Sequence, residues 1–148
     1  MARYDKNIRH LKEAVYAKLT GSSALTNLLG GNYIYHKSIP AKAKYPCVIY
    51  SVVSDEDNVF NEDQSTGEIT RTLLRVAVFS RSKKTEESDN IESLIKSLLH
   101  GKQTLDTTKI ICYSCYRDNL MEPMRDPDDQ VWVTQTRYRA TWAVKVIV

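Results

Sequence analysis

The chain has 148 residues, enough for one domain with a substantial core, and we expect residues 1–148 to form that single domain. Its composition, 42% hydrophobic and 26% charged, is typical of a soluble globular protein and argues against low-complexity or membrane-spanning segments. The formal net charge of +3 is too small to identify a nucleic-acid-binding protein. The first residues do not resemble a signal peptide, so we expect the chain to stay where it is made.

The N-terminal region predicts an amphipathic helix. Apolar side chains recur at helical spacing over residues 7–19, and either Asp5 or Asn7 is placed to cap the helix.

A second, short helix is predicted within residues 20–32. Ser22 or Ser23 supplies its N-cap and the pair Gly30-Gly31 ends it. The stretch YIYH, residues 33–36, follows as a short edge strand.

The stretch SIPAKAKYPCVIYSVV leads from a basic loop into a strand. Pro40 and Pro46 keep the loop extended, and a proline is tolerated at the start of a strand, so we expect a strand over residues 47–53. This strand is apolar on both faces, which predicts that both faces are covered. The acidic residues 54–68 are expected to form a long loop, followed by an antiparallel partner strand over residues 69–81.

The remaining elements are predicted from periodicity. A helix is expected over residues 85–100, a strand over 109–117, a turn-rich connection over 118–130, and a last strand over 131–146 with clean alternation.

The order helix, short helix, hairpin, helix, hairpin predicts an α+β fold. We expect one mainly antiparallel sheet of two hairpins with the helices packed on one face. A straight last strand would be about 55 Å long at 3.3 Å per residue, longer than a compact domain of this size is wide. It must therefore bend or extend past the body, where it would meet a neighbouring chain.

No catalytic constellation is recognisable in the sequence. Phosphate-binding glycine loops and a nucleophile elbow are missing, and the three histidines are isolated, so we expect no enzyme, no metal and no cofactor. Cys47, Cys112 and Cys115 are predicted to be reduced, buried thiols. The CxxC spacing of Cys112 and Cys115 lies in a strand, where residues three apart point to opposite faces, which disfavours joint chelation.

A row of basic residues allows two interpretations. Arg137 and Arg139, continued by Lys145 and Arg75, are consistent with a face that binds a phosphate backbone and equally with a hydrated outer strand face. A small α+β nucleic-acid-binding module therefore remains the alternative hypothesis.

Several stretches in order along the chain resemble the tail-completion (tail-terminator) proteins of long-tailed bacteriophages. They are the LT…ALT.LLGG helix pair, the IP…YPCVIY loop and strand, the strand end V.VFSR, and RDPD at Arg125–Asp128. The acidic loop is longer here, and LMEP is inserted before MRDPD.

The resemblance implies a structural virion protein that assembles in the host cytoplasm and has no membrane partner. It implies a homo-oligomeric, hexameric ring that caps the head-proximal end of the tail tube, ends its polymerisation and joins tail to head. The implied partners are the tail tube protein and the head connector, with DNA only as cargo passing through the ring.

We predict that partners are contacted by two groups of residues, one in the acidic loop and one between residues 121 and 139. The acidic loop combines carboxylates with two apolar side chains that a mere spacer would not need. The predicted contact residues are Asp55, Glu56, Asp57, Val59, Phe60, Glu62, Asp63, Met121, Met124, Arg125, Arg137 and Arg139.

Overall fold

The computed structural model describes residues 8–58, 69–127 and 130–145. In chain order the elements are α1 (Arg9–Thr20), α2 (Ser23–Leu29), β1 (Ile34–His36), β2 (Cys47–Asn58), β3 (Ile69–Ser80), α3 (Glu86–Leu99), β4 (Ile110–Leu120), β5 (Met124–Asp126) and β6 (Val131–Val144). None of the helices in these ranges has the length and apolarity needed to cross a bilayer.

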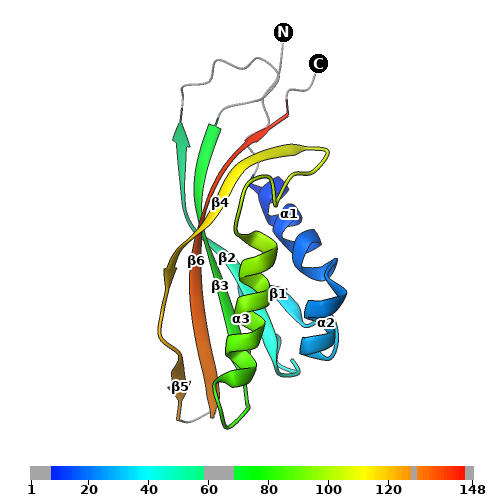
Figure 1. Cartoon of the computed structure of the whole chain (residues 1–148), viewed down its shortest axis with the longest axis vertical. Coiled ribbons are helices and arrows are strands. Elements are labelled where there is room, and N and C mark those ends of the chain that lie inside the picture. The colour runs from blue at the N-terminus through cyan, green and yellow to red at the C-terminus, as the bar shows by residue number, and fades with distance from the viewer. Residues whose placement is uncertain (1–7, 59–68, 128–129, 146–148) are drawn as a thin grey trace.

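The predicted α+β class is confirmed. The strands form one six-stranded sheet in the order β1-β2-β3-β6-β4, with β5 also paired to β6. Every pairing is antiparallel except that of β1 with β2. All three helices lie on one face of the sheet (Figure 1).

The helices form where the apolar periodicity predicts them. Helix α1 buries Leu11, Val15 and Leu19 against the sheet side. Its N-cap position is Ile8, which provides no side-chain cap; the expected caps Asp5 and Asn7 lie outside the described residues.

Helix α2 has the expected caps at both ends. The Ser22 hydroxyl accepts a hydrogen bond from the backbone N–H of Leu25 at 3.3 Å. Gly30 follows the last helical residue with φ 79°, a left-handed conformation that glycine adopts without a steric penalty.

Strand β2 is longer than the sequence predicts. The acidic residues Asp55, Glu56 and Asp57, expected in the loop, pair with β3 after a register shift between Val52 and Ser54. The prediction that residue 54 begins a loop was wrong because cross-strand pairing, which puts Glu56 opposite Arg71, extends the ladder beyond the apolar run.

Strand β6 lies between β3 and β4 in the sheet and also pairs with β5. Its even-numbered residues from Thr134 to Val144 are buried on the face toward the helices, as the alternation predicts. Among them, the indole Nε1 of Trp142 donates a buried hydrogen bond of 2.9 Å to Thr72 Oγ1 on β3.

The sheet is longer than the helix layer that covers it. Strand β6 and helix α3 each contain 14 residues, which correspond to about 46 Å of strand but only about 21 Å of helix. The strands accordingly twist and run on past the helices toward one end of the molecule (Figure 1). Of the two expected outcomes for the last strand, bending or extending past the body, the second is seen, and the neighbouring strands share it (Figure 1).

The expected separation of the two cysteines of the CxxC motif was wrong. A register shift between Cys112 and Ser114 adds one residue to β4, so that Cys112 faces Trp142 and Cys115 faces Ala140 across the ladder. Both thiols therefore belong to the hydrophobic core on the helix side.

On the sheet face opposite the helices, some side chains are buried by neighbouring strands of the same chain. Cys47 and Ile49 are buried there although the helices pack on the other face. Their cross-strand neighbours on β3 are Phe79 and Ala77, and Tyr35 of β1 lies opposite Ile49. The two-sided burial predicted for β2 is present, but it is reached within a single chain and does not itself require a neighbour.

Candidate assembly interface

Exposed apolar side chains gather where β4 passes into β5, at one edge of the sheet. Leu120 and Met121 are partly exposed, and Met124 is 63% exposed although it lies in a paired strand. Arg125 is the next exposed residue of β5. The structure thus brings together three residues that the sequence assigned to partner contacts, Met121, Met124 and Arg125.

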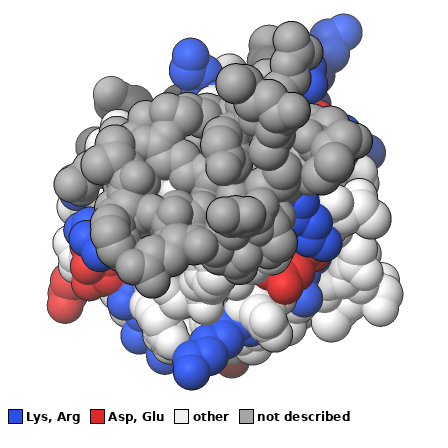
Figure 2. All heavy atoms as spheres, turned by 90° about the horizontal axis from the view of Figure 1, so that it is seen from above, with Lys and Arg blue, Asp and Glu red and all other residues white. Residues whose placement is uncertain are grey.

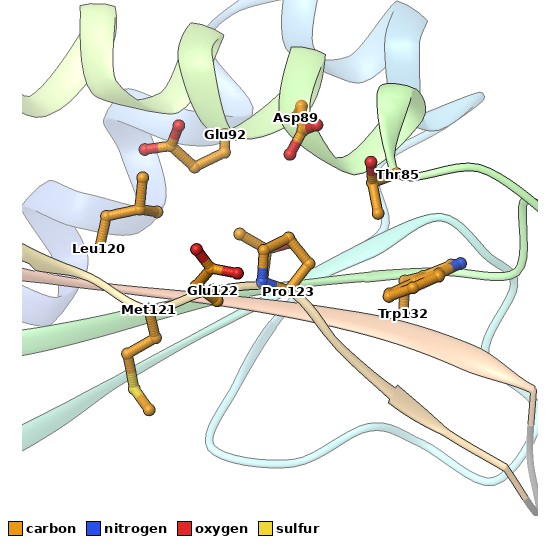
Figure 3. Close-up of a pocket in the computed structure, with 9 residues that line it drawn as sticks. Thr85, Asp89, Glu92, Leu120, Met121, Glu122, Pro123 and Trp132 are labelled. Carbon is orange, nitrogen blue, oxygen red and sulfur yellow. The ribbon is translucent and has the colours of Figure 1, made fainter.

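A pocket of about 510 Å³ lies beside this edge, between α3, the β4–β5 connection and β6. We call it the acidic pocket because three of its lining residues carry carboxylates. It is lined by Thr85, Asp89, Glu92, Leu120, Met121, Glu122, Pro123, Trp132 and Thr134. In the close-up, Asp89 and Glu92 descend from α3, and Glu122 lies on the opposite wall (Figure 3).

One lining residue of the acidic pocket, Glu92, is held in an ion pair. Glu92 is largely buried and its Oε1 accepts a hydrogen bond of 3.0 Å from Arg117 Nη1 on β4. The backbone N–H of Arg117 donates to His100 Nδ1 at the end of α3. Burial and the nearby Glu92 carboxylate raise the pKa of the Tyr138 hydroxyl, so it remains protonated. The pair fixes α3 to the β4 edge.

The remaining polar groups of the acidic pocket are less well satisfied. Thr134 is 2% exposed, and its buried Oγ1 has no hydrogen-bond partner in the structure. The buried Nε1 of Trp132 has none either, but it points away from the other labelled residues of the pocket (Figure 3). Buried polar groups without partners are uncommon in folded proteins and often mark a place where a ligand or solvent binds.

The predicted basic row is only partly assembled. Arg75 and Arg137 lie directly opposite each other on β3 and β6, on the face away from the helices. Arg139 forms an ion pair with Asp118 at 3.6 Å, which neutralises part of the row. Lys145 is exposed beyond the end of β6.

Only part of the acidic group of predicted contact residues lies within the described ranges. Asp55, Glu56 and Asp57 belong to strand β2. The other four predicted contact residues lie outside the described residues: Val59, Phe60, Glu62 and Asp63. Strand β2 ends at Asn58 and β3 begins at Ile69, and both of these strand ends lie where the sheet extends past the helices (Figure 1).

The three thiols have the environment of structural cysteines. All are buried and free, and burial raises the pKa of Cys47 and Cys112 to about 11 and that of Cys115 to about 12. Thiols bind metal as thiolates, which these values disfavour. Within the described ranges, no three His, Cys, Asp or Glu side chains converge in a way that would hold a metal ion.

Sequence reasoning missed the acidic pocket. Its walls come from residues 85–92, 120–123 and 132–134, which approach one another only after α3 packs on the sheet. One local signal existed: Glu92 lies four residues after Ser88 and three before Ile95, which places its carboxylate on the buried stripe of α3.

Comparison with known proteins gives the decisive observation. The family model described as "Tail completion protein gp17" matches residues 13–142, nearly the whole chain. The chain belongs to this family. As a tail completion protein it is a structural tail protein of a virion, which confirms the family resemblance seen in the sequence. No curated protein matches the sequence.

Solved structures show the same fold. A chain of the "Virion of native gene transfer agent (GTA) particle" superposes with a TM-score of 0.71 at 13% identity, over 94% of this tail completion protein and 99% of that chain. A second solved structure, known by a sequence identifier alone, gives a TM-score of 0.54 at 6% identity, over 95% and 97% of the two chains.

Proposed function

We propose that this tail completion protein forms a closed ring of six copies that caps the head-proximal end of the tail tube, ends its polymerisation and joins tail to head. The observation that carries the proposal is the family match over residues 13–142. The likeness to a chain of a gene transfer agent virion over nearly its full length is in keeping with a role inside a particle. The tail tube protein and the head connector are the proposed partners, with DNA passing through the ring.

The exposed edge of the sheet supports assembly with further copies. Leu120, Met121 and Met124 expose apolar surface. Exposed apolar patches of this kind often mark a surface that contacts another protein. A ring subunit has two different edges, each covered by the next copy, and this fold has different strands, β1 and β4–β5, at its two edges.

The nucleic-acid-binding alternative has weaker support. Of the four residues in the predicted basic row, Arg139 is paired with Asp118. Among the described residues visible in Figure 2, the Lys and Arg side chains lie apart from one another, between acidic and neutral residues. A backbone-binding surface usually concentrates positive charge.

Native mass spectrometry tests the proposal, together with a reconstruction of intact tails. We expect a mass of six chains, either free at high concentration or on the tail, with the ring at the tube end nearest the head. Binding of single- and double-stranded oligonucleotides at physiological salt is expected to be undetectable. A chain located outside any ring in the reconstruction would refute the proposal, and tight oligonucleotide binding by a monomer would favour the alternative.

We further propose that residues 55–63 bind one of the axial partners, the tube or the connector. The segment carries five carboxylates around Val59 and Phe60. An apolar side chain among steering charges is a common composition for a protein-binding surface.

A further inference from the structure

Two oppositely charged surfaces lie at the same level on the two edges of the sheet. The residues Cys47, Phe79, Val133 and Met124 are paired in one row across β2, β3, β6 and β5. The row begins beside the connection between β1 and β2 and ends beside the acidic pocket. Figure 1 shows that connection and β5 on opposite sides of the same end of the molecule.

The acidic pocket is suited to receive a cation. Asp89 and Glu122 carry no ion pair with any described residue, whereas Glu92 is already paired with Arg117. Asp89 extends from α3 and Glu122 lies on the opposite wall, so the two carboxylates border the same pocket (Figure 3). The buried hydroxyl of Thr134, which also lines the pocket and has no partner among the described residues, offers a further acceptor.

The chemistry of the acidic pocket favours an amino-acid side chain over a metal ion. Its carboxylates do not converge as metal ligands among the described residues. Its other walls are apolar, from Leu120, Pro123 and the ring of Trp132. A lysine combines an aliphatic stem, which would lie along those walls, with an ammonium group that donates three hydrogen bonds.

The opposite edge presents lysines of this kind. The connection over residues 37–46, which we call the basic loop, carries the exposed Lys37, Lys42 and Lys44 and no acidic residue. Its base is fixed because the guanidinium of Arg81 lies 4.2 Å from the centre of the Tyr45 ring. A loop held in this way loses less conformational entropy when it binds.

We propose that the basic loop of one copy inserts Lys42 or Lys44 into the acidic pocket of the next copy, where it pairs with Asp89 and Glu122. The contact is head-to-tail: each copy gives a loop on one edge and receives one on the other, which is the kind of interface that closes a ring. A second copy is the occupant because the complementary charges lie on the same chain at the same level. This inference rests on the proposed ring and names the contact that joins its subunits.

Charge reversal provides the test. The pocket variant carries Asp89→Lys and Glu122→Lys, and the loop variant carries Lys42→Glu and Lys44→Glu. Each is expected to weaken subunit association by roughly tenfold or more, because like charges then face each other across the contact. Association is measured by native mass spectrometry and sedimentation, or by completion of particles lacking the wild-type chain if the ring forms only on tails.

Two restored combinations make the test specific. A chain that carries all four substitutions regains complementary edges and is expected to associate like wild type. An equimolar mixture of the pocket variant and the loop variant is also expected to associate, in alternating order, because each loop then meets a pocket of opposite charge. Thermal unfolding verifies that each variant is folded. If the pocket variant does not fold, a chain with Asp89→Asn and Glu122→Gln is used in its place.

The outcomes separate the inference from the proposed function. Rings that form normally with the pocket variant or the loop variant alone would overturn the inferred contact. So would rings that fail to return in both restored combinations. Neither result would contradict the proposed ring itself. A wild-type chain that forms no ring in solution or on tails would refute the proposed function itself. Loss in both single variants and recovery in the combinations would establish the contact.

Discussion

Thr72 and Thr136 lie on the helix-facing side of neighbouring strands, and both are buried. They differ in their hydrogen bonds. The Thr72 hydroxyl accepts from the indole of Trp142, whereas the Thr136 hydroxyl has no partner within the part of the chain that the structure describes. A buried polar group stabilises a fold only when it is paired, so these two similar residues should contribute to stability with opposite signs.

The first prediction uses this contrast. Thr72→Val removes the acceptor and leaves the Trp142 N–H buried without a partner, which should lower the free energy of unfolding by about 1–3 kcal/mol. Thr136→Val has the same shape change but removes an unpaired hydroxyl, so it should leave stability unchanged or raise it. Urea unfolding measures both, and Thr72→Ser, which keeps the hydroxyl, should recover most of the loss. Equal destabilisation by the two valines would contradict the assignment.

The second prediction concerns the thiols. With pKa values raised to about 11 for Cys47 and Cys112 and about 12 for Cys115, the native protein at pH 8 contains very little thiolate. Its reaction with a thiol reagent should be at least roughly a hundredfold slower than that of the unfolded chain. Elemental analysis should find no zinc; one zinc per chain would contradict this prediction.

The same pKa values give a pH dependence of stability. The folded state keeps its thiols protonated, while the unfolded chain ionises them near the ordinary value of 9.0. Thiol ionisation therefore has no effect on stability below about pH 8 and lowers it as the pH rises from about 9 toward 11. Replacing the three cysteines with alanine should reduce this alkaline loss, as followed by urea unfolding at a series of pH values.

At the scale of whole elements, local chemistry decides where α2 begins. The sequence leaves Ser22 and Ser23 equivalent as caps, but only Ser22 has the extended backbone conformation of an N-cap residue and a bond to Leu25. The third prediction is that Ser22→Ala costs about 1 kcal/mol of unfolding free energy, while Ser23→Ala, at an exposed helical position, costs nothing measurable. A comparable loss in both variants would show that the cap does not determine stability.

Elements with strong periodicity were predictable, and features set by pairing between strands were not. The alternation of β6 and the apolar stripe of α3 can be recognised from a short stretch of sequence. The continuation of β2 to Asn58 and the extra residue at Cys112–Ser114 depend on partner strands far away in sequence. Met124 and Arg125 could be predicted as contact residues from the local sequence. The acidic pocket beside them could not, because its walls come from segments that are far apart in the sequence.

At the scale of the whole molecule, the two proposed contact regions lie at opposite ends of the sheet. The basic loop and the acidic pocket are at the end where β5 pairs with β6, whereas β2 ends at Asn58 and β3 begins at Ile69 at the other end (Figure 1). Contacts around a ring and contacts along the tail axis would then use separate parts of the subunit, and a substitution at one end should leave the other contact unaffected.

The last prediction tests that separation. Phe60→Ala, and in a second variant the replacement of Asp55, Asp57 and Asp63 by asparagine, should leave the ring mass at the wild-type value. Completion of particles should fall by roughly tenfold or more, since burying one phenylalanine contributes about 2 kcal/mol per subunit and the ring repeats the contact in every copy. Ser65→Ala, two residues beyond the proposed binding segment, is the matched control and should complete particles normally. Normal completion by both test variants would mean that the segment is only a spacer, and loss of the ring mass would mean that the two ends are not independent.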